Sequence, residues 1–126
     1  MPLSMTETTS TLQVRRYGEG ELQVASAEGL ARITTSVMLA PPTLHHPLRS
    51  AHPQALDPQD LEILFAASPE LVVIGTAAGQ LLLSARERSV FLERGIGLEV
   101  MALGPACRTF NVLAQEGRRV VALLFP

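Results

Sequence analysis

The fold of this chain is most clearly indicated by residues 95–126, GIGLEVMALGPACRTFNVLAQEGRRVVALLFP. Leu98-Glu-Val-Met101 predicts a strand, and apolar residues then recur at helical spacing from about Pro105 to Glu116. The run from Val120 to Phe125 predicts a further strand. The last third of the chain is therefore expected to form a strand, a helix and a strand.

A buried strand and a second helix are predicted immediately before this stretch. Leu71-Val-Val-Ile74 is apolar on both faces, as expected of a central strand. Ser84 and Glu87 have the spacing of a capping box at the start of a helix, and Gly95 is placed to end that helix in a left-handed conformation. The order strand, helix, strand favours a parallel crossover to residues 98–101.

Another helix is predicted after a proline-rich connection at residues 41–53. Asp57 is a favourable N-cap, and Pro58 suits the first helical position. Ser68-Pro69 ends this helix. A connection as long as 41–53 inside a compact domain often carries function.

The first third of the chain is predicted to be an antiparallel meander. Residues 1–11 are rich in Ser and Thr and are expected to be a disordered leader. Apolar and polar residues alternate at 12–15 and 21–24, and Gly18-Glu-Gly20 provides the positive φ of a tight turn between them. A third strand is predicted across residues 33–39. Residues 12–126 are expected to form a single domain.

Composition favours a folded domain with an aliphatic core. Of the 126 residues, 47% are apolar, 17% charged and 4% aromatic. All ten basic residues are Arg, and the net charge is −2. This balance gives no general attraction to phosphate backbones, so nucleic acid is not an expected partner.

The cysteine count and the hydropathy indicate a cytoplasmic protein. Cys107 is the single cysteine, which excludes an internal disulfide and fits a reducing compartment. The N-terminus lacks the features of a secretory signal. The longest apolar stretch, residues 71–83, is too short for a transmembrane segment.

Polar residues on the last helix provide the candidate site. Arg108, Asn111 and Gln115 share a face distinct from the apolar one, and the helix begins directly after a strand, where α/β proteins often bind ligands. Thr76, at the end of the buried strand, is expected to join them. These four residues could bind a partner or an anionic ligand. The alternative is that Arg108 pairs with a nearby Glu and Asn111 caps an exposed backbone group.

No residue pattern indicates a metal, a cofactor or a catalytic group. His45, His46 and His52 invite a metal interpretation, but no carboxylate lies near them before Asp57, so we expect no metal. Gly75-Thr-Ala-Ala-Gly79 lacks the Lys-Ser/Thr of a phosphate loop and is predicted to be a turn.

Cys107 follows the start of a helix, a placement that can lower a thiol pKa. The arginine cradle of a Cys-x5-Arg motif is missing, because position 113 is Leu. Cys107 is therefore expected to be a buried, unreactive residue.

Three segments resemble the small domain family that includes mitochondrial complex I assembly factor 3. They are Ile96-Gly-Leu-Glu-Val-Met101, Ala106-Cys-Arg-Thr-Phe-Asn-Val-Leu113 and Glu116-Gly-Arg-Arg-Val120, with Val72-Val-Ile-Gly-Thr76 upstream. The quartet Arg108-Thr109-Phe110-Asn111 is the most specific part. Phe110, Leu103 and His46 stand where the family usually has Tyr, Thr and Trp, and the loss of the Tyr and Thr hydroxyls removes two polar groups beside the expected pocket.

The resemblance implies an α/β fold with a three-layer β-β-α arrangement: mixed sheets, an N-terminal antiparallel meander and helices covering one face. It also implies, for the mitochondrial member, a non-enzymatic role in building the respiratory NADH:ubiquinone oxidoreductase together with a second assembly factor. Fold similarity by itself is an analogical argument for function.

The preferred interpretation is a non-enzymatic interaction or assembly protein that uses the last helix for docking. Its expected partner is a complex subunit or a second assembly factor; peripheral membrane association and homo-oligomers stay open. The alternative is a small-molecule (anion) binding protein or an enzyme, with a cleft at the N-terminus of the last helix formed by Thr76, Arg108 and Asn111.

Overall fold

The computed structural model of the protein describes residues 12–79 and 81–126, so the leader expected at residues 1–11 lies outside the described residues. The strands are β1 (Gln13–Gly18), β2 (Glu21–Ser26), β3 (Gly29–Ile33), β4 (Val37–Ala40), β5 (Thr43–His45), β6 (Leu71–Thr76), β7 (Gly97–Ala102) and β8 (Val120–Phe125). The helices are α2 (Pro58–Ala66), α3 (Ala85–Leu92) and α4 (Leu103–Gln115).

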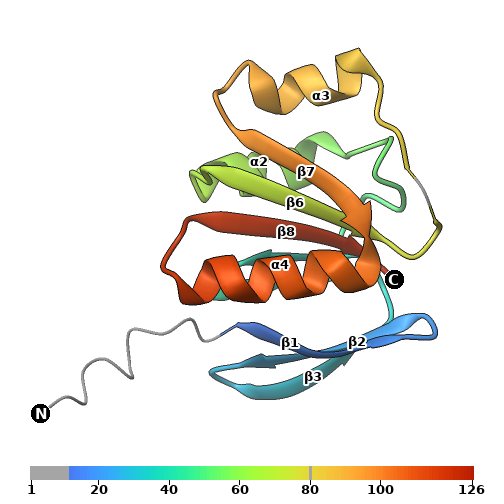
Figure 1. The fold of residues 1–126 in the computed structure, drawn as a ribbon, viewed down its shortest axis with the longest axis vertical. Helices are drawn as coiled ribbons and strands as arrows, with labels where there is room; N and C mark the ends of the chain where they lie inside the picture. The colour runs from blue at the N-terminus through green and yellow to red at the C-terminus, as the bar shows by residue number, and fades with distance from the viewer. Residues whose placement is uncertain (1–11, 80) are drawn as a thin grey trace, which may run out of the picture.

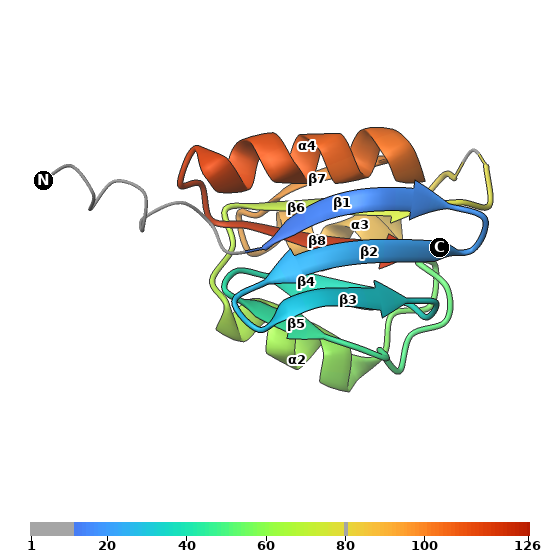
Figure 2. The ribbon, with the colours of Figure 1, turned by 90° about the horizontal axis from the view of Figure 1, so that it is seen from below.

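These strands form two sheets that pack against each other (Figure 1). The small sheet is antiparallel with the order β1-β2-β3, and the large mixed sheet has the order β5-β4-β8-β6-β7. Helices α2 and α3 cover one face of the large sheet, and α4 lies beside the small sheet on the other face (Figure 2). The expected α/β fold class, with two packed sheets and an N-terminal antiparallel meander, is confirmed. The expectation that the helices cover one face holds for α2 and α3, whereas α4 packs on the other face of the large sheet beside the small sheet.

The expected hairpin forms at the start of the small sheet. β1 pairs with β2 in antiparallel register from Gln13 opposite Ala25 to Gly18 opposite Glu21. Gly18 and Gly20 adopt φ values of 136° and 80°, so the turn uses backbone conformations that favour glycine. A bulge between Val14 and Arg16 shifts the register of β1.

The prediction of one strand across residues 33–39 was wrong. Ile33 ends β3 in the small sheet and Val37 begins β4 in the large sheet, so the chain crosses between sheets at residues 34–36. These three residues are polar, and Ser36 Oγ donates to Ser50 O at 2.7 Å. The alternation of apolar and polar residues does not reveal this break, because Ile33 before it and Val37 and Leu39 after it all fit one alternating pattern.

Two of the three predicted helix starts, at Asp57 and Ser84, are confirmed. Asp57 accepts a hydrogen bond from Gln59 N at 2.8 Å, and the Ser84–Glu87 capping box is complete in both directions. Gly95 has a φ of 71°, as expected of a left-handed helix end. Helix α4 begins at Leu103, slightly earlier than predicted.

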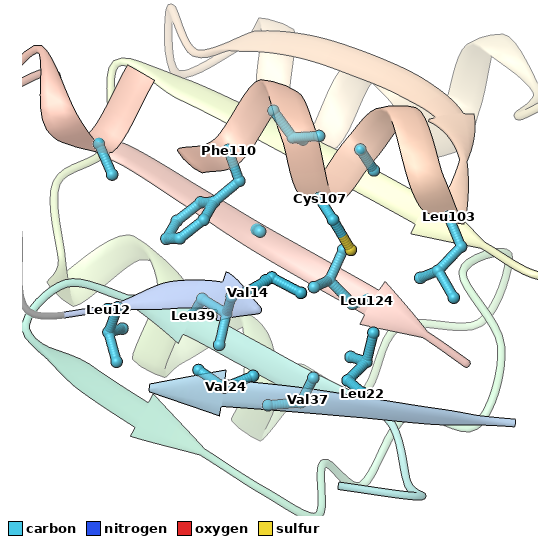
Figure 3. Packing of buried hydrophobic residues seen from close by; sticks show 14 of the residues in the cluster. Leu12, Val14, Leu22, Val24, Val37, Leu39, Leu103, Cys107, Phe110 and Leu124 are labelled. Carbon is cyan, nitrogen blue, oxygen red and sulfur yellow. The ribbon is translucent and has the colours of Figure 1, made fainter. Parts of the chain in front are cut away.

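Two apolar cores lie on the two sides of the large sheet. The first joins α4, the small sheet and one face of the large sheet, and Figure 3 shows Phe110 and Cys107 directed from α4 into it. The second joins α2 and α3 to the opposite face, where the rings of Phe65 and Phe91 meet edge to face at 6.4 Å between centroids. Strand β8 is buried along its whole length because it lies at the centre of the large sheet.

Gly75 sets the distance between α4 and the large sheet. A Cβ atom at this position would lie 2.4 Å from Ala106 Cβ and 3.0 Å from a Leu124 methyl carbon. Such contacts are far closer than van der Waals packing allows, so α4 can only approach β6 over a glycine. The glycine turn predicted at residues 75–79 thus begins inside β6, and Gly79 carries the positive φ of 91°.

Candidate functional site

The side chain of Asn111 binds the edge of β1. Its Oδ1 accepts from Val14 N at 2.9 Å, and its Nδ2 donates to Val14 O at 3.0 Å. A side-chain amide therefore pairs with Val14 as a neighbouring strand would, at an edge of the small sheet that otherwise exposes backbone groups. Figure 2 shows β1 running beside α4.

Arg108 also contacts the small sheet. Its Nη1 donates to the hydroxyl of Tyr17 at 2.5 Å. The Tyr17 ring lies against Gly104, where a Cβ atom would be 2.8 Å from Tyr17 Cε1. A glycine one turn before Arg108 thus leaves room for the ring, and the hydroxyl reaches the guanidinium. Among residues 12–79 and 81–126, Arg108 forms no ion pair with a Glu, which is the pairing that the sequence left as an alternative.

The other two residues of the conspicuous quartet also have partners inside the protein. Phe110 is fully buried in the first core, and Thr109 Oγ1 donates to Met101 Sδ at 3.6 Å. The most specific sequence motif of this chain therefore joins α4 to the small sheet and to β7. That internal role accounts for these residue types without a ligand.

Thr76 and Gln115 lie apart from Arg108 and Asn111. Thr76 is buried at the end of β6 with its side chain on the sheet face opposite α4, and its Oγ1 accepts from Ala78 N at 3.1 Å. Gln115 is exposed at the last position of α4. The structure brings Arg108 and Asn111 together beside β1, but it does not bring Thr76 to them. The cavity that Thr76 lines includes neither Arg108 nor Asn111 among its described walls.

The thiol of Cys107 is buried in the first core (Figure 3). Burial raises its pKa to about 12, and the nearby charge of Arg108 lowers the pKa by a smaller amount. The thiol therefore stays protonated at neutral pH, and the protonated form is a poor nucleophile. This agrees with the expectation from the sequence.

Residues 12–79 and 81–126 contain no cluster of three His, Cys, Asp or Glu side chains with the spacing to hold a metal ion. His45 ends β5, and His46 follows it with an exposed side chain. His52 lies further along the connection, in the wall of a cavity.

Sequence reasoning missed a polar cluster that organises this connection. Asp60 is 5% exposed, and its Oδ2 accepts from Ser50 N at 2.7 Å and from Ser50 Oγ at 2.5 Å. Ser50 Oγ in turn accepts from Asp57 N at 2.8 Å. The sequence did contain a sign of this cluster: Asp60 is an acidic residue on the apolar side of a short amphipathic helix, next to Leu61 and Leu64. A buried carboxylate needs several donors, and the connection supplies them.

In the part of the chain that the structure describes, no helix is both long and apolar enough to cross a bilayer.

Comparison with known proteins assigns the chain to a family. Residues 14–125 match the family described as "Protein of unknown function (DUF498/DUF598)". The 13 kDa major membrane protein of Francisella tularensis is 30% identical over 92 residues, which are 64% of this chain and 75% of that protein. The human NADH dehydrogenase (ubiquinone) 1 alpha subcomplex assembly factor 3 is 40% identical over 57 residues, which are 45% of this chain and 31% of the human protein.

Solved structures share the fold. A protein from Xanthomonas campestris is 31% identical with a TM-score of 0.77, covering 99% of this chain and 92% of that one. A protein of Bartonella henselae described as an outer membrane protein is 28% identical with a TM-score of 0.74, covering 93% and 94% of the two chains. The resemblance to the assembly factor 3 family is thereby confirmed, and the protein belongs to the DUF498/DUF598 family of proteins of unknown function.

Proposed function

We propose that this protein is a non-enzymatic interaction protein that assists the assembly of a respiratory or other membrane-associated complex. The observation that carries the proposal is the 40% identity to the human complex I assembly factor 3 over 57 residues. The matched part is 31% of the human factor, so the shared property is expected to belong to this domain. Two relatives described as membrane proteins support a role beside a membrane.

The proposed docking surface is the solvent-facing side of α4, defined here as Arg108, Val112 and Gln115. These positions are four and three residues apart, so they follow one side of the helix. Val112 is 55% exposed, although it sits on a helix whose other apolar residues are buried or partly buried. Arg108 keeps most of its donors for a partner, because its bond to Tyr17 uses one of five. The partner would be a complex subunit or a second assembly factor, met in the cytoplasm.

Cross-linking in the organism that encodes the chain tests this proposal. The tagged full-length protein, produced at its native level, should co-purify with identified subunits of a respiratory or other membrane-associated complex. Val112→Glu should remove these subunits, because it places a charge in the centre of the docking surface. Ile63→Glu is the matched control, since Ile63 is an apolar residue, 39% exposed, on α2 across the molecule.

Two results would contradict the proposal. One is that no subunit of such a complex is enriched over an untagged strain. The other is that Val112→Glu and Ile63→Glu change the recovered subunits equally while both variants melt like the parent protein.

A further inference from the structure

A cavity of about 700 Å³ opens at the carboxyl ends of the parallel strands β6 and β8. Its walls come from the crossing at residues 34–36, the connection at residues 47–54, residues 76–78 with Leu81, and residues 125–126. These segments gather at the edge of the molecule where Figure 1 marks the C-terminus. Ligands of α/β proteins bind at the carboxyl ends of parallel strands, and this volume lies within the range of small-molecule sites.

Hydrogen bonds fix the wall formed by residues 47–54. Asp60 holds Ser50 through both its backbone N–H and its hydroxyl, and it accepts from Arg49 N at 3.3 Å. From the other side, Leu48 N donates to Ser36 O at 3.1 Å, and Ser36 Oγ donates to Ser50 O. The wall is therefore held in place from α2 and from the crossing, so the cavity exists without a ligand.

The lining combines apolar residues with one cation. Leu48, Leu81 and Phe125 provide apolar surface, and hydroxyl groups come from residues 34–36 and from Thr76. Among the lining residues that the structure describes, Arg49 alone has a permanently charged side chain, and none is Asp or Glu. Its Nε lies 3.3 Å from Asp57 Oδ2, and its side chain is 61% exposed. One carboxylate satisfies at most two of the five guanidinium donors, so donors remain for a ligand.

We propose that this cavity binds a small organic carboxylate with an apolar body. The carboxylate would accept hydrogen bonds from Arg49 and from the hydroxyl groups of Thr34 and Thr76, because Thr35 and Ser36 already donate to main-chain oxygen atoms. The apolar body would lie over Leu81 and Phe125. A single cation already facing Asp57 suits a monoanion better than a phosphate dianion. The site differs in place and in residues from the docking surface on α4, so this inference does not rest on the proposed function.

Other hollows on the molecule fit such a ligand less well. A hollow of about 590 Å³ over the small sheet is lined by Arg16 and Arg32 but also by Glu19 and Glu21, so its charges offset one another. A groove of about 350 Å³ between α2 and α3 is mainly apolar, and its Arg86 lies next to Glu87. The cavity with Arg49 differs from both, because its described lining residues include a cationic and several polar side chains but no acidic one.

Three probes with the same apolar body and different heads test the proposal by ¹⁵N NMR of the full chain. We expect 3-phenylpropionate to shift the backbone signals of Thr35, Ala77 and Ala78 saturably, and 3-phenylpropanol to bind at least about threefold more weakly. Inorganic phosphate should cause no saturable shift. The third probe, 3-phenylpropylamine, carries a cation on the same apolar body and tests whether the cavity prefers the opposite charge.

Arg49→Gln should weaken 3-phenylpropionate binding about three- to tenfold. Arg32→Gln is the matched control, because Arg32 is also an exposed arginine paired with a carboxylate, Glu21, but lies on the small sheet. Unchanged signals away from the cavity show that Arg49→Gln is folded. The proposal is overturned if the acid causes no saturable shift, if the alcohol, the amine or phosphate binds as well as the acid, or if Arg49→Gln and Arg32→Gln bind it equally.

Discussion

The two faces of the large sheet are covered in different ways. On the α4 side, a helix and a second sheet share one apolar core, and polar side chains join them along their common border: Asn111 to Val14, and Arg108 to Tyr17. On the α2/α3 side, two short helices with capped N-termini cover the sheet, and a long connection is held by a buried carboxylate.

This difference shows that a conspicuous motif need not mark a ligand site. The quartet at residues 108–111 stands out in the sequence, yet on the α4 side it joins parts of the protein to each other. The cavity with Arg49 lies at the edge of the molecule beside the connection at residues 47–54, and no short sequence motif predicts it. Strong residue preferences at the border between a helix and a sheet edge are explained by the need to satisfy backbone groups there.

The largest effect should come from removing β8, which contributes to both sides. Deletion of residues 120–126 should unfold the whole domain, because Val121, Leu123 and Phe125 each stabilise it by roughly 1.5–3 kcal/mol and the sheet loses its central strand. Circular dichroism during heating is the measurement. A truncated protein with a cooperative melting transition would show that the two sides do not depend on a common strand.

Gly75→Ala should destabilise the α4 side by about 1–3 kcal/mol, because the new methyl group meets Ala106 Cβ at 2.4 Å. Gly97→Ala on the neighbouring strand is the control, since the nearest atom there is the flexible end of Leu71 at 3.1 Å. Urea unfolding compares the two variants. Equal losses of stability would contradict the idea that α4 needs a glycine beneath it.

Asn111→Ala should cost about 1–3 kcal/mol, because it leaves the backbone N–H and C=O of Val14 without partners in a half-buried place. Gln115→Ala, four residues further along the same helix, removes an exposed amide and should change stability by less than about 0.5 kcal/mol. Hydrogen exchange of the Val14 amide should accelerate in Asn111→Ala. Unchanged exchange there would mean that the border of the α4 side is held by apolar packing alone.

The titration and the reactivity of Cys107 report whether water reaches the apolar core beneath α4. The folded thiol has a pKa of about 12 against an ordinary 9.0, so its contribution to stability is present below pH 9 and is lost as the pH rises toward 12. Alkaline unfolding should therefore be less steep in Cys107→Ala. At neutral pH, a thiol reagent should modify the unfolded protein only, and rapid modification of the folded protein would show that water reaches this core.

The smallest effect is expected at Glu70, which links the start of β6 to the turn between α4 and β8. Hydrogen bonds from Arg118 Nε and from the Arg119 N–H, each 3.1 Å, hold the pKa of Glu70 below its ordinary 4.5. Stability from this pair is present above pH 4.5 and falls as the pH drops through the folded pKa. Glu70→Gln should flatten the acid dependence of the melting temperature slightly, and an unchanged acid dependence would contradict a role for this pair.

Much of the secondary structure could be predicted from the residues alone. The helix starts at Asp57 and Ser84, the hairpin glycines and the apolar run of β8 are local signals, carried by residues within about four positions of each other. The strand break at residues 34–36 and the short strand β5 could not be predicted in this way. They depend on which sheet each segment joins.

The sequence by itself determined most of the elements, several of their ends and the resemblance to the family. Only the tertiary structure decided that Asn111 faces β1, that Thr76 points away from α4, and that Asp60 holds the cavity wall. The physical reason is distance along the chain: Asn111 and Val14 are 97 positions apart, so the partner that satisfies each polar group is chosen by long-range packing. Periodicity tells which residues share a face, but it does not tell what that face meets.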